Sequence, residues 1–267
     1  MTGAPAAAET AAEPSHRSSG GLFLHQLRTE QLTFWRSRES AVFVFVFPLL
    51  LYALLGAVYS SEIDGLPAAD VLLAGLIGYG CANTAFAGLA IVLVIRRESG
   101  VLKRLGATPL PRPVYLAAVL SSSLLVFVVQ TVVLVALGAV LYGATVPERP
   151  LSLAGAVLVG TACFAGLGLA AASLIRSAEG SSAAVNVVVL PMAFLSGAFG
   201  PTRDFPSWLQ AIADVLPLKY FIDVVRGVLL RDEPVWTDPG ALAVLAVWGV
   251  AGLLVAWRRL GWEPRER

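Results

Sequence analysis

The stretch with the most chemical potential is short and charged: IRRESGVLKRLGATPLPRPVY, residues 95–115. It opens with Arg96, Arg97 and Glu98, continues through a short basic helix, and stops at Thr108-Pro109. The prolines that follow rigidify the chain where it enters the next apolar run. A solvated loop accounts for the positive charges alone. An acid in a compact helix followed by prolines favours a surface on which another protein docks.

Motifs for nucleotide, metal or nucleophile chemistry are absent from the sequence. There is no GxxxxGK[ST] phosphate loop, no HExxH and no GxSxG. The two histidines, His16 and His25, both precede the first apolar run. Cys81 and Cys163 lie inside apolar runs, which excludes a disulfide framework and a CxxC metal site. We therefore predict no cofactor and no catalytic residue on this chain.

Three isolated amides interrupt the apolar runs: Asn83, Gln130 and Asn186. Amides at this depth often hydrogen-bond across neighbouring helices, and that packing role is one interpretation. The other is that all three line a translocation path for an amphiphilic solute. No carboxylate lies inside any apolar run, which disfavours a proton- or sodium-coupled carrier.

The elements that must position these residues are membrane helices. The chain has 267 residues, of which 57% are hydrophobic and 14% charged, whereas soluble domains carry about 25% charged residues. Its net charge of +1 offers no basic field for nucleic acid. A membrane span needs about 20 apolar residues in a helix. Six runs meet or approach this length: residues 41–59, 71–95, 114–142, 151–175, 183–199 and 240–257.

Positive charge predicts the orientation of these spans, because cytoplasmic loops are rich in Lys and Arg. With a cytoplasmic N-terminus, 14 of the 19 basic residues lie inside. The opposite orientation reverses this split. Both termini are therefore predicted to be cytoplasmic, with residues 1–20 forming a disordered tail and residues 258–267 a second tail.

Residues 21–40 are predicted to form an amphipathic helix in the inner headgroup layer. Trp35 lies on the apolar face with Leu24 and Leu27, while Arg28, Glu30 and Arg36 are expected on the polar side. A plain helical extension of the first span is the alternative.

Residues 201–236 are predicted to form a pair of short helices outside the membrane, dipping into the outer leaflet and turning back. Apolar side chains repeat at helical spacing from Trp208, and Pro217 ends that repeat. Asp223 and Arg226 interleave with a second repeat and are too costly for a full span. The predicted fold class is thus an all-α integral membrane protein with six spans, an interfacial N-terminal helix and an outer re-entrant hairpin.

The stretch RRESGVLKRLGATPLPRP resembles the cytoplasmic coupling loop of type-2 ATP-binding-cassette (ABC) exporter permeases, such as daunorubicin-resistance permeases and teichoic-acid and O-antigen exporters. The run VLPMAFLSGAFGPTRDFPSWLQ is similar to the fifth span and outer segment of that family. The resemblance extends over residues 34–261. The matching loop residues are Glu98, Gly100, Leu102, Lys103, Arg104, Leu105, Ala107, Thr108, Pro109 and Leu110.

This resemblance implies a bacterial cell-membrane permease subunit that is not itself an enzyme. Two copies of a separate ATPase subunit would bind ATP and Mg, and a second permease, identical or related, would complete the path. Glu98 and the Lys103/Arg104 pair would transmit movement from the ATPase. The expected substrate is a hydrophobic or amphipathic drug, antibiotic or lipid-linked molecule.

Other functions stay open at this point. Within the family, the alternative is export of a lipid-linked polysaccharide or teichoic acid. A membrane-embedded enzyme or an ATP-independent carrier is less favoured, because the spans lack His, Asp, Glu, Lys and Arg.

Overall fold

The structure, a computed structural model, describes residues 19–59, 62–63 and 65–259. These residues are almost entirely helical, and their one sheet is the antiparallel pair of two-residue strands β1 and β2. The predicted tails fall largely on residues 1–18 and 260–267, which lie outside the described residues. In chain order the elements are α1 (Ser19–Arg36), α2 (Arg38–Val58), β1 (Glu62–Ile63), β2 (Leu66–Pro67), α3 (Ala68–Cys81), η1 (Ala82–Gly88), α4 (Leu89–Glu98), α5 (Val101–Gly106), α6 (Arg112–Tyr142), α7 (Pro150–Leu174), α8 (Ala178–Leu195), α9 (Ser207–Ala213), α10 (Pro217–Leu230) and α11 (Pro239–Arg259).

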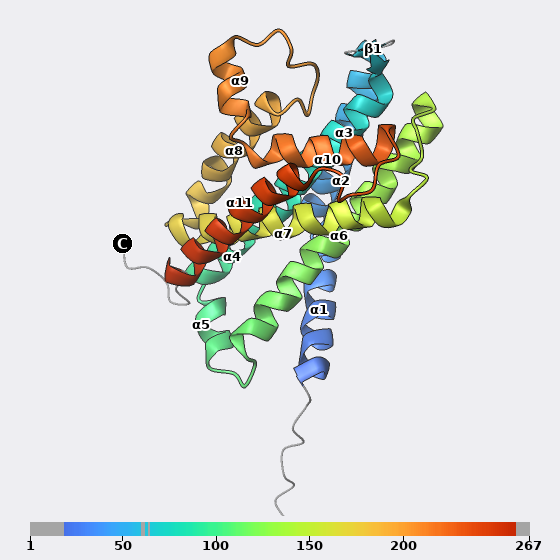
Figure 1. Cartoon of the computed structure of the whole chain (residues 1–267). Helices are drawn as coiled ribbons and strands as arrows, with labels where there is room; N and C mark the ends of the chain where they lie inside the picture. The colour runs from blue at the N-terminus through green and yellow to red at the C-terminus, as the bar shows by residue number, and fades with distance from the viewer. Residues whose placement is uncertain (1–18, 60–61, 64, 260–267) are drawn as a thin grey trace, which may run out of the picture.

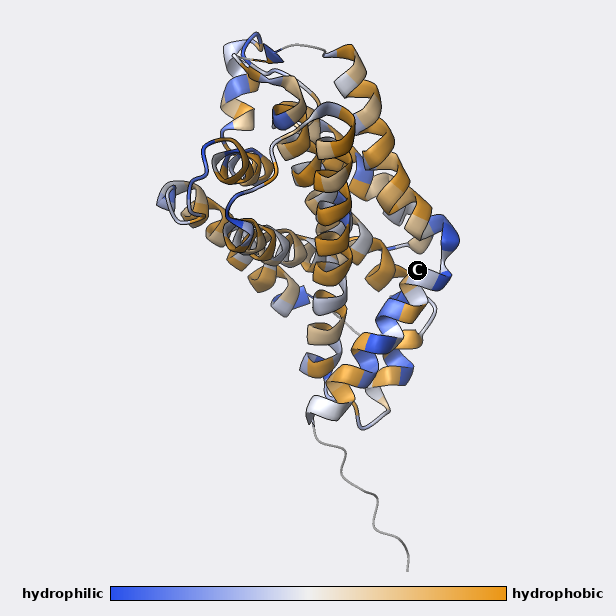
Figure 2. Cartoon of the chain, turned by 90° about the vertical axis from the view of Figure 1, so that its right-hand side faces the viewer, coloured by the Kyte–Doolittle hydropathy of each residue, from blue (hydrophilic) through white to orange (hydrophobic). Residues whose placement is uncertain are grey.

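Within the described residues, six helical segments are long and apolar enough to cross a membrane, which confirms the predicted all-α integral membrane fold. Hydrophobic residues dominate these helices, as Figure 2 shows. Helices satisfy their own backbone hydrogen bonds, which is why apolar runs of this length adopt them in lipid. The six segments are Ala41–Val58, Ala68–Glu98, Arg112–Tyr142, Pro150–Leu174, Ala178–Leu195 and Pro239–Arg259.

The fifth span begins and ends earlier than residues 183–199. Ser177 caps the first turn of α8, its Oγ accepting from the Gly180 amide at 3.3 Å, so the helix starts at Ala178. At the other end Gly197 adopts φ +73°, a left-handed conformation that stops the helix. The apolar run through Phe199 therefore continues beyond the helix itself.

The second span is interrupted by a π-helical segment, η1, between α3 and α4. The wider turns of a π-helix are rare and concentrate at functional sites. The apolar pattern of residues 71–95 predicts only a continuous α-helix. Asn83 and Thr84 both lie on η1.

Helix α3 forms the centre of the bundle, in contact with α2, α6, α7 and α10. Thirteen of its fourteen residues are buried. Small residues allow the closest approaches between other helices: a Cβ on Gly166 of α7 would lie 2.5 Å from the Gly249 carbonyl oxygen of α11.

Short helices lie at the two ends of the molecule. Figure 1 places α5 at the opposite end from α9 and β1. A second apolar cluster joins the helix ends near α5, with Leu93, Leu102, Tyr115, Ala172 and Ala256 among its buried members. The ends of α4, α6, α7 and α11 therefore meet around α5. The two helices expected within residues 201–236 are present as α9 and α10, and α10 packs against α3, α7 and α11.

The helix expected over residues 21–40 is divided at Ser37 into α1 and the start of α2. Arg28, Trp35 and Arg36 are exposed, and the Trp35 ring stacks on Phe45 with centroids 5.4 Å apart. The prediction that Glu30 lies on the solvated face is wrong. Glu30 is buried because α1 packs against α6 and offers its carboxylate to α4.

Candidate functional site

Helix α5 is connected to α4 by a sharp turn and packs against it through an apolar contact. Gly100 has φ +72°, a conformation that glycine adopts without steric cost. Leu102 is 3% exposed and joins the apolar cluster at the ends of α4 and α6, so it holds α5 in place. Lys103 and Arg104 are exposed.

The segment after α5 is a compact turn. The Thr108 hydroxyl donates to the Leu105 carbonyl at 2.7 Å and accepts from the Leu110 amide at 3.4 Å. Pro109 follows and is exposed. The region from Gly100 to Pro109 thus carries exposed basic side chains on a hydrogen-bonded turn, and its role as a docking surface stays a prediction.

Arg96, at the end of α4, connects three helices. Its guanidinium donates to both carboxylate oxygens of Glu30 on α1, at 2.8 and 2.7 Å, and to the Tyr115 hydroxyl on α6 at 2.8 Å. The side chains of Arg96 and Glu30 are 18% and 8% exposed. A bidentate pair in such surroundings is well ordered and fixes the relative position of the helices.

Arg97 is directed toward the end of α7. Its guanidinium donates to the carbonyl oxygens of Ala172, at 2.7 Å, and of Ile175, and the residue is 3% exposed. Carbonyls in the last turn of a helix have no partner within the helix, and a cation favours the negative end of the helix dipole.

The Glu98 carboxylate accepts a hydrogen bond from the backbone amide of Ala178, the first residue of α8. This contact joins positions 80 residues apart, so sequence reasoning, which assigns Glu98 to the partner ATPase, does not find it. Arg96, Arg97 and Glu98 therefore connect the end of α4 to α1 and α6, to α7 and to α8.

A cavity of about 770 Å³ lies beside this cluster. Side chains from α1, α2, η1, α4, α6 and α8 line it. Its walls combine apolar residues such as Phe43, Ile91 and Val126 with hydroxyls, amides and the Glu30–Arg96 pair. Cavities of this volume and character are typical of sites for small organic ligands.

Two of the three amides proposed for the path lie in this cavity. Asn83, on η1, is 8% exposed, and its side chain has no hydrogen bond to any described residue. Asn186, on α8, donates to the Ser182 carbonyl. Gln130 lies outside the lining, 1% exposed, where it accepts from Thr84 at 3.1 Å and donates to the Val44 carbonyl at 3.1 Å. Its position is that of a residue bridging three helices.

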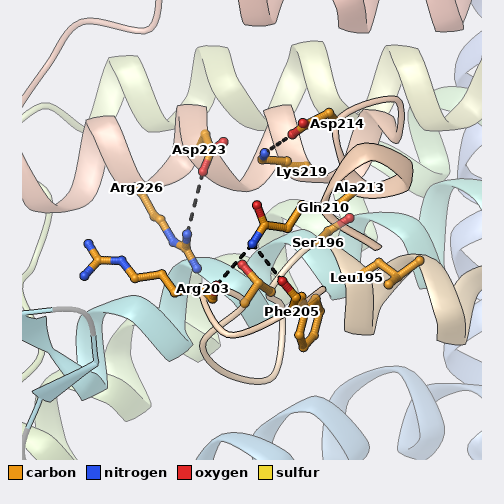
Figure 3. Close-up of a pocket in the computed structure, with 11 residues that line it drawn as sticks. Leu195, Ser196, Arg203, Phe205, Gln210, Ala213, Asp214, Lys219, Asp223 and Arg226 are labelled. Atoms are coloured by element: carbon orange, nitrogen blue, oxygen red, sulfur yellow. Dashed lines mark hydrogen bonds and ion pairs between the residues drawn. The ribbon is translucent and has the colours of Figure 1, made fainter. Parts of the chain in front are cut away.

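A smaller polar cavity of about 320 Å³ lies at the other end, between α8, α9 and α10 (Figure 3). Arg226 donates to the Gly197 carbonyl at 3.2 Å and lies 3.6 Å from the carboxylate of Asp223. Burial raises the pKa of the Asp223 carboxyl, and the nearby Arg226 charge opposes that shift. Pro217 starts α10 and is buried, whereas Trp208 on α9 is 63% exposed.

No group of three or more His, Cys, Asp or Glu side chains within the described ranges could hold a metal ion. Sequence reasoning missed Glu30 and Arg97 as site residues. Both act through contacts with distant segments, and neither differs by type or spacing from an ordinary charge near a membrane surface.

Comparison with known proteins agrees with this architecture. The family model described as ABC-2 type transporter matches residues 22–230. The probable multidrug ABC transporter permease YbhR of Escherichia coli (strain K12) is 24% identical over 166 residues, covering 61% of this chain and 45% of that protein. The inner membrane transport permease YhhJ of the same strain is 30% identical over 173 residues, covering 60% and 45% respectively. The putative transport permease YvfS of Bacillus subtilis (strain 168) is 22% identical over 205 residues, covering 76% and 83%.

The family match extends over most of the chain, from the first turn of α1 to the end of α10. The chain therefore belongs to the ABC-2 type transporter family, in keeping with the six described helices that are long and apolar enough to cross a membrane. It spans about half the length of the two Escherichia coli relatives.

Proposed function

We propose that this chain is the membrane subunit of an ATP-driven exporter, and that it moves a hydrophobic or amphipathic compound out of the bacterial cytoplasm by alternating access. The observation that carries the proposal is the cavity of about 770 Å³ beside the α4–α5 junction. A place for a ligand and a candidate docking helix lie on the same segment, α4–α5. A movement of the docking helix can therefore change the ligand cavity, and the reverse.

The lining of the cavity favours a drug-sized amphiphile. Its apolar walls suit a hydrophobic body, and the Asn83 amide can donate to or accept from a polar group. A volume of this size accommodates a small molecule better than a polymer. The name of YbhR, a probable multidrug permease, is in keeping with such a substrate.

The energy source is assigned to a separate ATPase, because the sequence has no phosphate loop. We assign its docking site to α5, where Lys103 and Arg104 are exposed and can form charge-assisted bonds. Two ATPase subunits would bind ATP and Mg, and a second permease copy, identical or related, would complete the path. The excess of basic residues in the segments on the α5 side favours a cytoplasmic position for this end.

Purification of the tagged chain from its native membrane tests the proposal. We expect an ABC ATPase to copurify, and inside-out vesicles containing the complex to accumulate the amphiphilic dye rhodamine 6G only when ATP is supplied. Charge reversal at both Lys103 and Arg104 should abolish copurification while leaving the permease in the membrane. The proposal would be overturned if no ATPase accompanied the purified chain, or if export proceeded without ATP.

A further inference from the structure

The two residues that precede α5 hold both sides of a turn on another part of the chain. Arg97 donates to carbonyls at the end of α7, and Glu98 accepts from the first amide of α8. Between those helices lie only Ile175, Arg176 and Ser177. One dipeptide therefore spans the α7–α8 junction.

Each contact suits the helix end that it meets. The last carbonyls of α7 carry partial negative charge and take the Arg97 guanidinium, while the first amides of α8 carry partial positive charge and take the Glu98 carboxylate. Arg97 is 3% exposed and Glu98 is half-buried. Water competes little for bonds in such surroundings, so the junction is fixed to α4.

The same dipeptide is connected closely to α5. Only Ser99 and Gly100 separate Glu98 from α5. Leu102 is buried against α4 and α6, and Arg104 donates to the Ser99 carbonyl at 3.5 Å. We therefore expect a shift of α5 to shift the Arg97–Glu98 pair as well.

Helix α8 extends from this junction into the cavity wall. Ser182 and Asn186, one and two turns beyond Ala178, both line the cavity. A displacement of the first turn of α8 would therefore change the shape of the cavity.

We propose that Arg97 and Glu98 are positioning residues that transmit displacement of α5 to the α7–α8 junction, and through α8 to the cavity wall. The inference rests on the proposed function, since an ATPase must displace α5. It assigns Glu98 an action on α8 within the permease, in place of direct contact with the ATPase.

Three variants separate these two roles for Glu98. Glu98→Ala removes the acceptor, whereas Glu98→Gln removes the charge but keeps a carbonyl oxygen that can accept from Ala178. Glu179→Ala is the matched control, because Glu179 is an exposed acid in the first turn of α8. Hydrogen exchange of the Ala178 amide is measured on the permease alone. Retention of the copurified ATPase is measured on the complex, together with the ATP-dependent fluorescence change of bimane at Val187→Cys, an exposed position on α8.

In Glu98→Ala we expect exchange at Ala178 to rise about tenfold. The ATPase should be retained, and the ATP-dependent fluorescence change should be lost. Glu98→Gln and Glu179→Ala should resemble the wild type in all three measurements. Arg97→Met should also lose the fluorescence change while retaining the ATPase, since it frees the end of α7.

Two results would overturn the inference alone. One is loss of the ATPase in both Glu98→Ala and Glu98→Gln with unchanged exchange at Ala178, which would make Glu98 a direct contact of the ATPase. The other is a full fluorescence change in Glu98→Ala despite faster exchange, which would show that the junction transmits nothing. If the wild-type chain retains no ATPase, the proposed function itself fails, and this inference with it.

Discussion

At the scale of single residues, substitution within the Glu30–Arg96 pair is expected to lower the free energy of unfolding markedly. Its two side chains are largely removed from solvent, and Arg96 also holds the Tyr115 hydroxyl. Glu30→Ala leaves a guanidinium at low exposure without its carboxylate, and removing one partner of a buried pair costs about 3 kcal/mol. We expect the free energy of unfolding in detergent micelles to fall by that amount.

A double-mutant cycle checks the origin of this loss. Arg96→Met together with Glu30→Ala removes both charges, so the pair of substitutions should cost clearly less than the sum of the two single ones. Strict additivity would mean that the two side chains do not interact in the folded protein.

The two buried amides should respond differently to truncation. Gln130 bridges Thr84 and the Val44 carbonyl, so Gln130→Ala should lower the free energy of unfolding by about 1–3 kcal/mol. Asn83 bonds to no described side chain or backbone group, and Asn83→Ala should leave stability nearly unchanged.

Binding of rhodamine 6G to the purified permease, followed by fluorescence polarisation, completes that comparison. Asn83→Ala should weaken binding several-fold, because the cavity loses its free amide. If Asn83→Ala destabilises the protein as much as Gln130→Ala and leaves dye binding intact, both amides serve packing alone.

At the scale of elements, α7 and α11 depend on glycine for their contact. A Cβ on Gly166 would approach the Gly249 carbonyl oxygen, which is backbone and cannot rotate away. Gly166→Ala should force the two helices apart and lower the free energy of unfolding by about 1–3 kcal/mol. Gly20→Ala on α1 is the control, since no atom lies within 4 Å of a Cβ there, and it should be neutral or slightly stabilising. Equal stability of the two variants would contradict the packing argument.

The elements themselves follow from the sequence because lipid admits few alternatives. An apolar run of sufficient length must become a helix, and all six appear within a few residues of their predicted ends. The exceptions have local causes. The Ser177 cap and the left-handed Gly197 move the fifth span, and the overall apolar pattern of residues 71–95 does not distinguish η1 from the α-helices on either side of it.

The candidate site is less predictable, because its contacts join distant segments. The loop from Gly100 to Pro109 stands out by composition, and the structure keeps its basic residues exposed. The partners of Arg97 and Glu98 lie 75 to 80 residues away along the chain, and no local sequence pattern predicts them. Glu30 shows the same limit, since helical periodicity places it among solvated charges until α4 supplies Arg96.

At the scale of the whole molecule, the helix ends gathered around α5 come from segments that the positive charges assign to the cytoplasm. The ends of α4 and α7 meet through Arg97, and Ala256 near the end of α11 lies in the same apolar cluster as Leu102. The outer segment with α9 lies at the opposite end (Figure 1). The fold therefore brings together at one end the segments that the charge distribution assigns to one side of the membrane, and labelling can test that assignment.

Cysteine labelling with a membrane-impermeant maleimide makes that test. Lys103→Cys on α5 and Asp204→Cys before α9 are both exposed, and the native Cys81 and Cys163 are buried and should stay unreactive. We expect Asp204→Cys to react in intact cells, and Lys103→Cys to react only in inverted vesicles. The reverse pattern would put α5 outside the cell, where no ATP is available to a docked ATPase, and would remove α5 from the energy-coupling role. Labelling of both positions from one side would require an even number of crossings between them, and so would contradict the assignment of α6, α7 and α8 as three spans.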